Sequence, residues 1–135
     1  MSTQIFVNLP VKDLDKSMAF YKNLGFEFNP KFTDETAACM VISEANYAML
    51  LTHEKFAGFG PNPIGDAHAQ TAVMIAISLD SREAVDDMTA KAVASGGKTF
   101  RDVEDHGFMY GHAFQDPDGH VWEPFFMEPD AMPRS

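Results

Sequence analysis

Apolar and aromatic side chains gather in short segments along this chain, many of them alternating with polar ones. Alternation with a period of two is typical of β-strands that bury one face. In segment 5–11, for example, Ile5, Val7 and Leu9 fall on one face, while Phe6 and Asn8 fall on the other. The pattern predicts strands over residues 5–11, 26–32, 38–43, 47–52, 71–79, 98–103, 109–115 and 120–126.

Two other segments have the spacing of amphipathic helices. The first begins after Asp13, a good N-cap residue, and ends at Gly25. We predict that the second is capped by Asp80, with Glu83 as the reciprocal partner, and that it ends at Gly96. The apolar positions that define the two helices are Leu14, Met18, Tyr21 and Leu24 in the first and Val85, Met88 and Ala92 in the second.

The order of these elements repeats once along the chain. Each half reads strand, helix and then further strands, which is a βαβββ module. We predict a single α+β domain over 1–135, with module one at about 1–54, a joint loop at about 55–69 and module two at about 70–128. The two modules would form a curved, incomplete barrel-like sheet around a cleft, with the helices outside.

The charge of the chain limits its partners. Acidic residues outnumber basic ones 20 to 10 in 135 residues, a formal net charge of −10. This balance disfavours nucleic acid and anionic membrane surfaces, since few side chains would neutralise phosphates. The single cysteine, Cys39, and the lack of a signal-like or membrane-spanning apolar run favour a protein of the reducing cytoplasm.

A β-hairpin near the C-terminus carries the first candidate for chemistry. Asp116-Pro117-Asp118-Gly119 has the residues of a tight turn, and the strand that follows it alternates. Val121, Glu123 and Phe125 share one face of that strand, and Trp122 and Phe126 share the other. Glu123 is therefore a carboxylate between apolar side chains, where it can serve as a ligand or a base. The alternative is an edge-strand glutamate that faces water.

Two motifs give the chain a family resemblance. They are Val11-Lys12-Asp13-Leu14 leading into Phe20-Tyr21-Lys22-Asn23-Leu24-Gly25-Phe26, and Asp116-Pro117-Asp118-Gly119-His120-Val121-Trp122-Glu123. With the repeated βαβββ order, they resemble the vicinal oxygen chelate superfamily. That superfamily includes glyoxalase I, bleomycin-resistance proteins, fosfomycin-resistance enzymes and extradiol dioxygenases.

The resemblance implies a divalent metal bound by side chains in a cleft. Matching the family's ligand positions by motif gives Phe6, Leu50, Met74 and Glu123, of which only Glu123 suits a hard divalent ion. One carboxylate is too few, because catalytic zinc-type sites use about three protein ligands. We therefore expect a degenerate metal site and no bound cofactor. His112 should point away from the cleft, because it neighbours Ala113, which matches a pocket position.

The same matching predicts an apolar binding site. We expect its lining to be Phe6, Asn8, Phe32, Leu50, Met74, Ala113 and Phe125, with Glu123 as the catalytic candidate. Convergent polar groups on an apolar lining are typical of small-molecule sites. The alternative is that these side chains simply fill the barrel. Because burying a carboxylate without a ligand or a donor costs several kcal/mol, a buried Glu123 needs a ligand or a donor such as Asn8.

Two functions follow from these expectations. In the first, the protein binds a small, largely apolar organic molecule without metal chemistry, as bleomycin-resistance-like members of the superfamily do. In the second, it is an enzyme of the lyase, isomerase or dioxygenase-like kind, with Glu123 as base or as the remaining metal ligand. In either case we expect a homodimer, since isologous dimers are the commonest closed assemblies.

Overall fold

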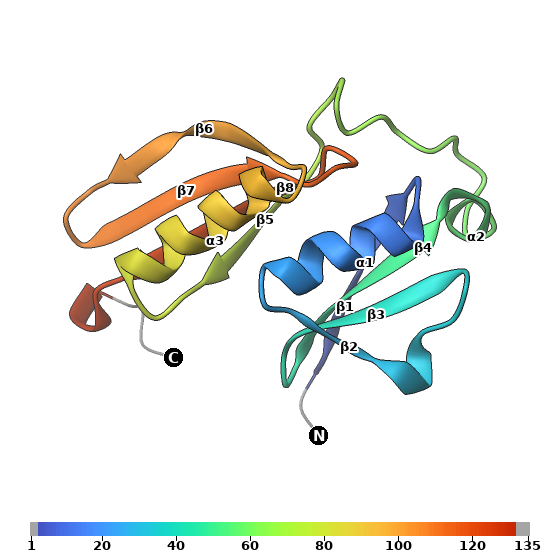
Figure 1. Cartoon of the computed structure of the whole chain (residues 1–135), viewed down its shortest axis with the longest axis horizontal. Coiled ribbons are helices and arrows are strands. Elements are labelled where there is room, and N and C mark those ends of the chain that lie inside the picture. Colours follow the sequence, from blue (N-terminus) through green and yellow to red (C-terminus); the bar gives the residue numbers. More distant parts are fainter. Residues whose placement is uncertain (1–2, 132–135) are drawn as a thin grey trace. The chain divides into compact units, whose positions relative to one another are not determined.

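The computed structural model describes residues 3–131 and shows two compact units. One runs up to Asp66 and the other begins at Ala67, so the boundary falls inside the predicted joint loop. Figure 1 shows that each unit contains a four-stranded sheet and one long helix.

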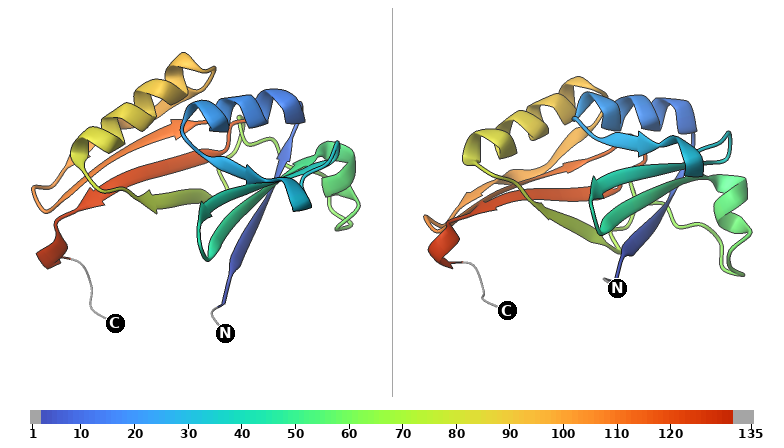
Figure 2. Two further views of the ribbon diagram at one scale, coloured as in Figure 1. Left: turned by 60° about the horizontal axis from the view of Figure 1, so that its bottom comes forward. Right: turned by 90° about the horizontal axis from the view of Figure 1, so that it is seen from below.

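The first unit is a βαβββ module. Its strands are β1 (Ile5–Val11), β2 (Glu27–Asn29), β3 (Ala37–Ser43) and β4 (Asn46–Thr52), and α1 (Leu14–Asn23) follows β1. The sheet order is β1-β4-β3-β2, with β1 parallel to β4 and the other neighbours antiparallel. Asp13 caps α1 as predicted, because its carboxylate accepts a hydrogen bond from the Lys16 amide at 3.1 Å. Figure 2 shows α1 lying along its sheet.

The second unit repeats that order. Its strands are β5 (Met74–Ser78), β6 (Lys98–Asp105), β7 (Met109–Gln115) and β8 (Val121–Met127), and α3 (Arg82–Ala94) follows β5. The sheet order is β5-β8-β7-β6, again with one parallel pair, β5 and β8. This second sheet packs α3 against one face (Figures 1 and 2). The predicted α+β class and the two βαβββ modules are confirmed.

Several predicted boundaries are wrong. The second long helix is capped by Ser81 instead of Asp80, because the Ser81 hydroxyl accepts from the Ala84 amide at 3.0 Å. Segment 26–32 is a short strand followed by a 3-10 helix, η1 (Pro30–Phe32), since Pro30 suits the first turn of a helix.

The joint loop begins with a short helix, α2 (His53–Ala57), capped by Thr52. A second 3-10 helix, η2 (Pro129–Ala131), follows β8. None of the helices within residues 3–131 is both long and apolar enough to cross a membrane.

The predicted hairpin is present between β7 and β8. Asp116 is buried, and its carboxylate accepts hydrogen bonds from the amides of Asp118 and His120, both at 2.9 Å. Gly119 adopts a φ of 90°, which favours glycine. An added Cβ at Gly119 would lie 2.7 Å from the His68 backbone nitrogen, so this turn is closed on its outer side by the chain at 67–68.

A tyrosine joins α3 to the second sheet. The Tyr110 hydroxyl donates to the Asp86 carboxylate at 2.6 Å, and that bond, with burial and the Asp86 charge, raises the pKa of Tyr110 to about 12. Because the bond needs the protonated hydroxyl, its stabilisation is present below pH 10 and lost between pH 10 and 12. We expect the Tyr110 ring to titrate near pH 12 in a ring-carbon NMR titration. Asp86→Asn should return its pKa toward 10.0; a wild-type Tyr110 that already titrates there would contradict the prediction.

Candidate functional site

Charged side chains form a row on one face of the second sheet. The Arg101 guanidinium donates through Nη2 to Glu123 Oε2 and through Nε to Glu104 Oε1, the latter at 3.0 Å. His106 Nε2 donates to the other oxygen of Glu104 at 3.2 Å. The row thus runs from β8 across to the end of β6. We call the face that carries it the Glu123 face.

Two irregularities in β6 bring the row together. Arg101 pairs with Ala113 and Glu104 pairs with Gly111, although Arg101 and Glu104 are three positions apart. In a regular strand, residues three apart point to opposite faces. The register shifts between Thr99 and Arg101 and between Arg101 and Glu104, so both side chains emerge on the Glu123 face.

The small side chain of Ala113 leaves room for Arg101 to reach Glu123. The register of β7 and β8 pairs Gly111 with Phe125 and Phe114 with Trp122, which places Ala113 opposite Glu123. Ala113 therefore lies between Arg101 on β6 and Glu123 on β8, and it is completely buried. A larger residue at this position would occupy the path along which Arg101 reaches Glu123.

Hydrogen bonds within the row stabilise the charged forms of Glu104 and Arg101. Hydrogen bonds from His106 and Arg101 lower the pKa of Glu104 below its usual range. The hydrogen bond to Glu123 raises the pKa of Arg101 further above its already high value. The row therefore holds the Arg101 guanidinium between the side chains of Glu104 and Glu123.

Glu123 lies on the face of β8 that the alternation of the sequence predicts, but its hydrogen-bond donor was not predicted. Trp122 and Phe114 are completely buried and lie on the opposite face of the sheet from Glu123. The donor that bonds to Glu123 is Arg101, which was not among the predicted site residues. Sequence reasoning missed Arg101, Glu104 and His106, since the register shifts that align them are not visible in the alternation of 98–103.

The other predicted lining residues divide between the two units. In the first, Phe6 and Asn8 are exposed, and Phe6 stacks on Tyr47 with ring centroids 4.7 Å apart. Leu50 does not share their face: Phe6 pairs with Tyr47, Asn8 with Met49 and Leu9 with Leu50. Leu50 is completely buried on the face of Leu9, so its predicted place beside Phe6 is wrong. Phe32 is exposed at the end of η1.

In the second unit, three predicted residues lie on the Glu123 face. Met74 pairs with Val121 and Ala76 with Glu123, so Met74 is on this face and half-exposed. Phe125 pairs with Gly111 and is partly buried. Ala113 lies between Arg101 and Glu123. The Glu123 face thus combines apolar side chains with the charged row.

The histidines do not assemble a metal site. His112 and Ala113 are adjacent on β7, so His112 lies on the opposite face from Glu123, as expected. His68 donates to the Pro117 carbonyl at 3.0 Å. Within residues 3–131, no three His, Cys, Asp or Glu side chains are grouped so that they could hold a metal ion. The donors that are present therefore do not fit the metal that the resemblance implies.

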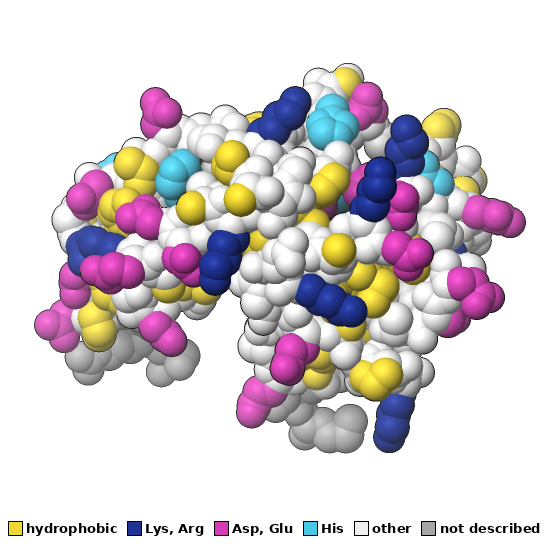
Figure 3. All heavy atoms as spheres, viewed as in Figure 1, with side chains coloured by type: hydrophobic (Ala, Val, Ile, Leu, Met, Phe, Trp, Pro, Cys, Tyr) yellow, Lys and Arg dark blue, Asp and Glu magenta, His cyan; other side chains and the backbone are white. Residues whose placement is uncertain are grey.

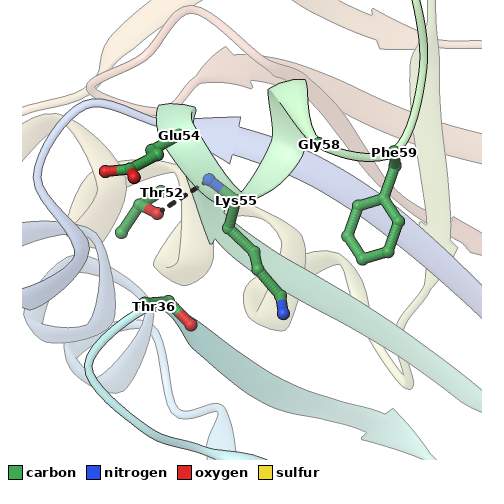
Figure 4. Close-up of a pocket in the computed structure, with 6 residues that line it drawn as sticks. All are labelled: Thr36, Thr52, Glu54, Lys55, Gly58 and Phe59. Atoms are coloured by element: carbon green, nitrogen blue, oxygen red, sulfur yellow. Dashed lines mark hydrogen bonds between the residues drawn. The ribbon is translucent and has the colours of Figure 1, made fainter.

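A separate pocket of about 340 Å³ lies in the first unit, beside α2 (Figure 4). It is lined by Thr36, Thr52, Glu54, Lys55, Gly58 and Phe59. The Lys55 ammonium lies 5.7 Å from the centre of the Phe59 ring, and the Lys55 amide donates to the Thr52 hydroxyl at 3.3 Å. One ammonium and one carboxylate line this pocket, so neither sign of charge dominates it.

The surface charge is mixed. On the face that Figure 3 shows, the Lys and Arg side chains of the described residues are scattered among Asp and Glu side chains. They do not gather into one basic patch there.

Comparisons with known proteins agree with this architecture. A sequence model of the family described as bleomycin resistance protein-like, N-terminal, matches residues 3–43. No curated protein sequence matches the chain. Among solved structures, a hypothetical protein from S. aureus has a TM-score of 0.78 at 28% identity, covering 93% of this chain and 95% of the other.

Two further structures have informative names. A glyoxalase/bleomycin resistance protein/dioxygenase family enzyme from Burkholderia phytofirmans has a TM-score of 0.75 at 19% identity, covering 93% and 99% of the two chains. A fosfomycin resistance protein from Listeria monocytogenes has a TM-score of 0.68 at 22% identity, covering 96% and 97%. The chain has the vicinal oxygen chelate fold. The resemblance found in the sequence is thereby confirmed, and in this fold Glu123 lies on the last strand of the second module.

Proposed function

We propose that this protein binds a small, largely apolar organic molecule on the Glu123 face of the second sheet, without metal chemistry. The observation that carries the proposal is the ion pair of Arg101 and Glu123, which lies among apolar side chains. Glu123 is fixed by Arg101, and Met74, Val121 and Phe125 lie on the same face. A few positioned polar groups on an apolar surface are typical of small-molecule sites. Similarity to proteins named for bleomycin and fosfomycin resistance supports a small-molecule ligand.

A metal is not needed for this function. Of the four ligand positions implied by the superfamily, three carry Phe6, Leu50 and Met74. Phenyl and alkyl groups cannot bind a divalent ion, and the thioether of Met74 suits soft metals instead of hard divalent ones. That the protein carries no stoichiometric metal stays a prediction, which elemental analysis of protein purified without chelator would check.

A neutral, environment-sensitive dye such as Nile red can test the proposed site. Met74→Arg places a charge on the Glu123 face, so we expect saturable dye binding to be lost. Val93→Arg on α3 is the matched control, because Met74 and Val93 are exposed to 50% and 48%. Binding that survives Met74→Arg, or that is equally lost in both variants, would contradict the proposal.

The second candidate is an enzyme that uses Glu123 as a base. It is favoured by Glu123 Oε1, which accepts no hydrogen bond from residues 3–131, since only Oε2 bonds to Arg101. Against it, a substrate proton would compete with the guanidinium for the same carboxylate. Turnover of a carbonyl compound that is lost in Glu123→Gln would favour the enzyme, whereas saturable binding without turnover favours the binder.

We also propose a homodimer, which sedimentation equilibrium at micromolar concentration would check.

A further inference from the structure

The Arg101 guanidinium is hydrogen-bonded through Nε and Nη2 along one edge, while Nη1 lies on the other edge. Its Nε and Nη2 donate to two different carboxylates, so the guanidinium plane is fixed before any ligand arrives. A guanidinium has about five N–H donors in a planar fork, and these two bonds leave both hydrogens of Nη1 as well as the second hydrogen of Nη2. Within residues 3–131, no side chain or carbonyl accepts from Nη1. Because the Arg101 side chain is 35% exposed, these donors can reach a ligand.

Glu123 offers the complementary group. Its Oε2 accepts from Arg101, while Oε1 has no donor among the described residues. The side chain is 22% exposed, so it is shielded but not closed off. A free donor and a free acceptor therefore belong to one ion pair on the Glu123 face.

The charge of the row disfavours ligands that are ions. A ligand carboxylate would meet one guanidinium already offset by two carboxylates, Glu104 and Glu123. A ligand ammonium would lie next to the guanidinium itself. A neutral group that accepts from Arg101 and donates to Glu123 satisfies both without adding charge, and such pairs carry more specificity than a single contact.

We propose that Arg101 and Glu123 together recognise a neutral planar group with an acceptor and a donor, namely an amide, attached to an apolar ring. The inference rests on the proposed function, since the ring would lie against the apolar side chains of the same face. Phe125 and Met74 provide that surface. Arg101 is thus a specificity-determining residue of the site.

Four fragments with one phenyl ring test this assignment: benzamide, benzoate, benzylamine and toluene. Each is titrated into the full chain labelled with ¹⁵N, and the shifts of the Ala113 and Glu123 amides and of Arg101 Nε are followed. We expect benzamide to bind at least about tenfold more tightly than the other three, because only it makes both charge-assisted hydrogen bonds.

Two arginine variants provide the matched comparison. Arg101→Lys keeps the charge but removes the planar fork, so the preference for benzamide over toluene should disappear. Arg82→Lys is the control, since Arg82 also pairs with a glutamate, Glu128, and has a side chain 36% exposed. It should leave the preference unchanged.

The outcomes separate this inference from the proposed function. Equal binding of toluene and benzamide at the Glu123 face overturns the amide assignment and leaves the apolar site standing. Tighter binding of benzoate or benzylamine also overturns the assignment. If no fragment shifts the resonances of this face in the folded protein, the proposed function fails as well.

Discussion

Gly119→Ala should destabilise the second unit more than any other single-methyl addition at its glycines. Its φ of 90° already disfavours an alanine, and the new Cβ would lie 2.7 Å from the His68 nitrogen and 2.8 Å from the Ala67 carbonyl carbon. Both contacts are backbone atoms, so relief requires the chain at 67–68 to move and to strain the hydrogen bond from His68 to Pro117. We expect a loss of about 3–4 kcal/mol in the free energy of unfolding.

Gly96→Ala provides the matched control. Gly96 has a φ of 110° at the end of α3, but nothing lies within 4 Å of an added Cβ. Its substitution should cost only the backbone strain, about 1–2 kcal/mol. Denaturant unfolding of both variants measures the difference, which isolates the overlap at Gly119. Equal losses would show that the chain at 67–68 does not hold the turn.

Ala113→Leu should disrupt both stability and the candidate site. Ala113 is completely buried between Arg101 and Glu123, so the added carbons must displace the ion pair or the strands. Overpacking a buried position typically costs about 1–3 kcal/mol. We also expect the bond from Arg101 Nη2 to Glu123 to break and the displaced guanidinium to loosen the bond from Nε to Glu104, so the Arg101 Nε–H resonance should move toward that of a solvated arginine.

Ala76→Leu is the control for that variant. Ala76 pairs with Glu123 from the other side, on β5, but is exposed. The same added volume there should change the free energy of unfolding by no more than about 0.5 kcal/mol. An Ala113→Leu variant with wild-type stability and an unchanged Arg101 resonance would rule out the role assigned to Ala113.

Much of the fold could be predicted from local patterns. The alternation in 109–115 predicts β7 with the observed bounds, and Asp13 and Gly25 mark the limits of α1. The predictions that failed depend on competition between neighbouring candidates. Asp80 and Ser81 are both good N-cap residues, and only the path of the chain decides that the Ser81 hydroxyl meets the Ala84 amide.

The sequence alone determined that Glu123 and Phe125 share one face opposite Trp122, because side chains on a strand alternate with a period of two. Only the tertiary structure decided what Glu123 meets. Its partner Arg101 comes from a strand with two register shifts, and each shift moves every following side chain to the other face. Leu50 was misplaced for a related reason, since a motif match gives a position along a strand but the register with β1 decides its face. The residues that surround a group are fixed by pairing between distant strands, which local periodicity does not record.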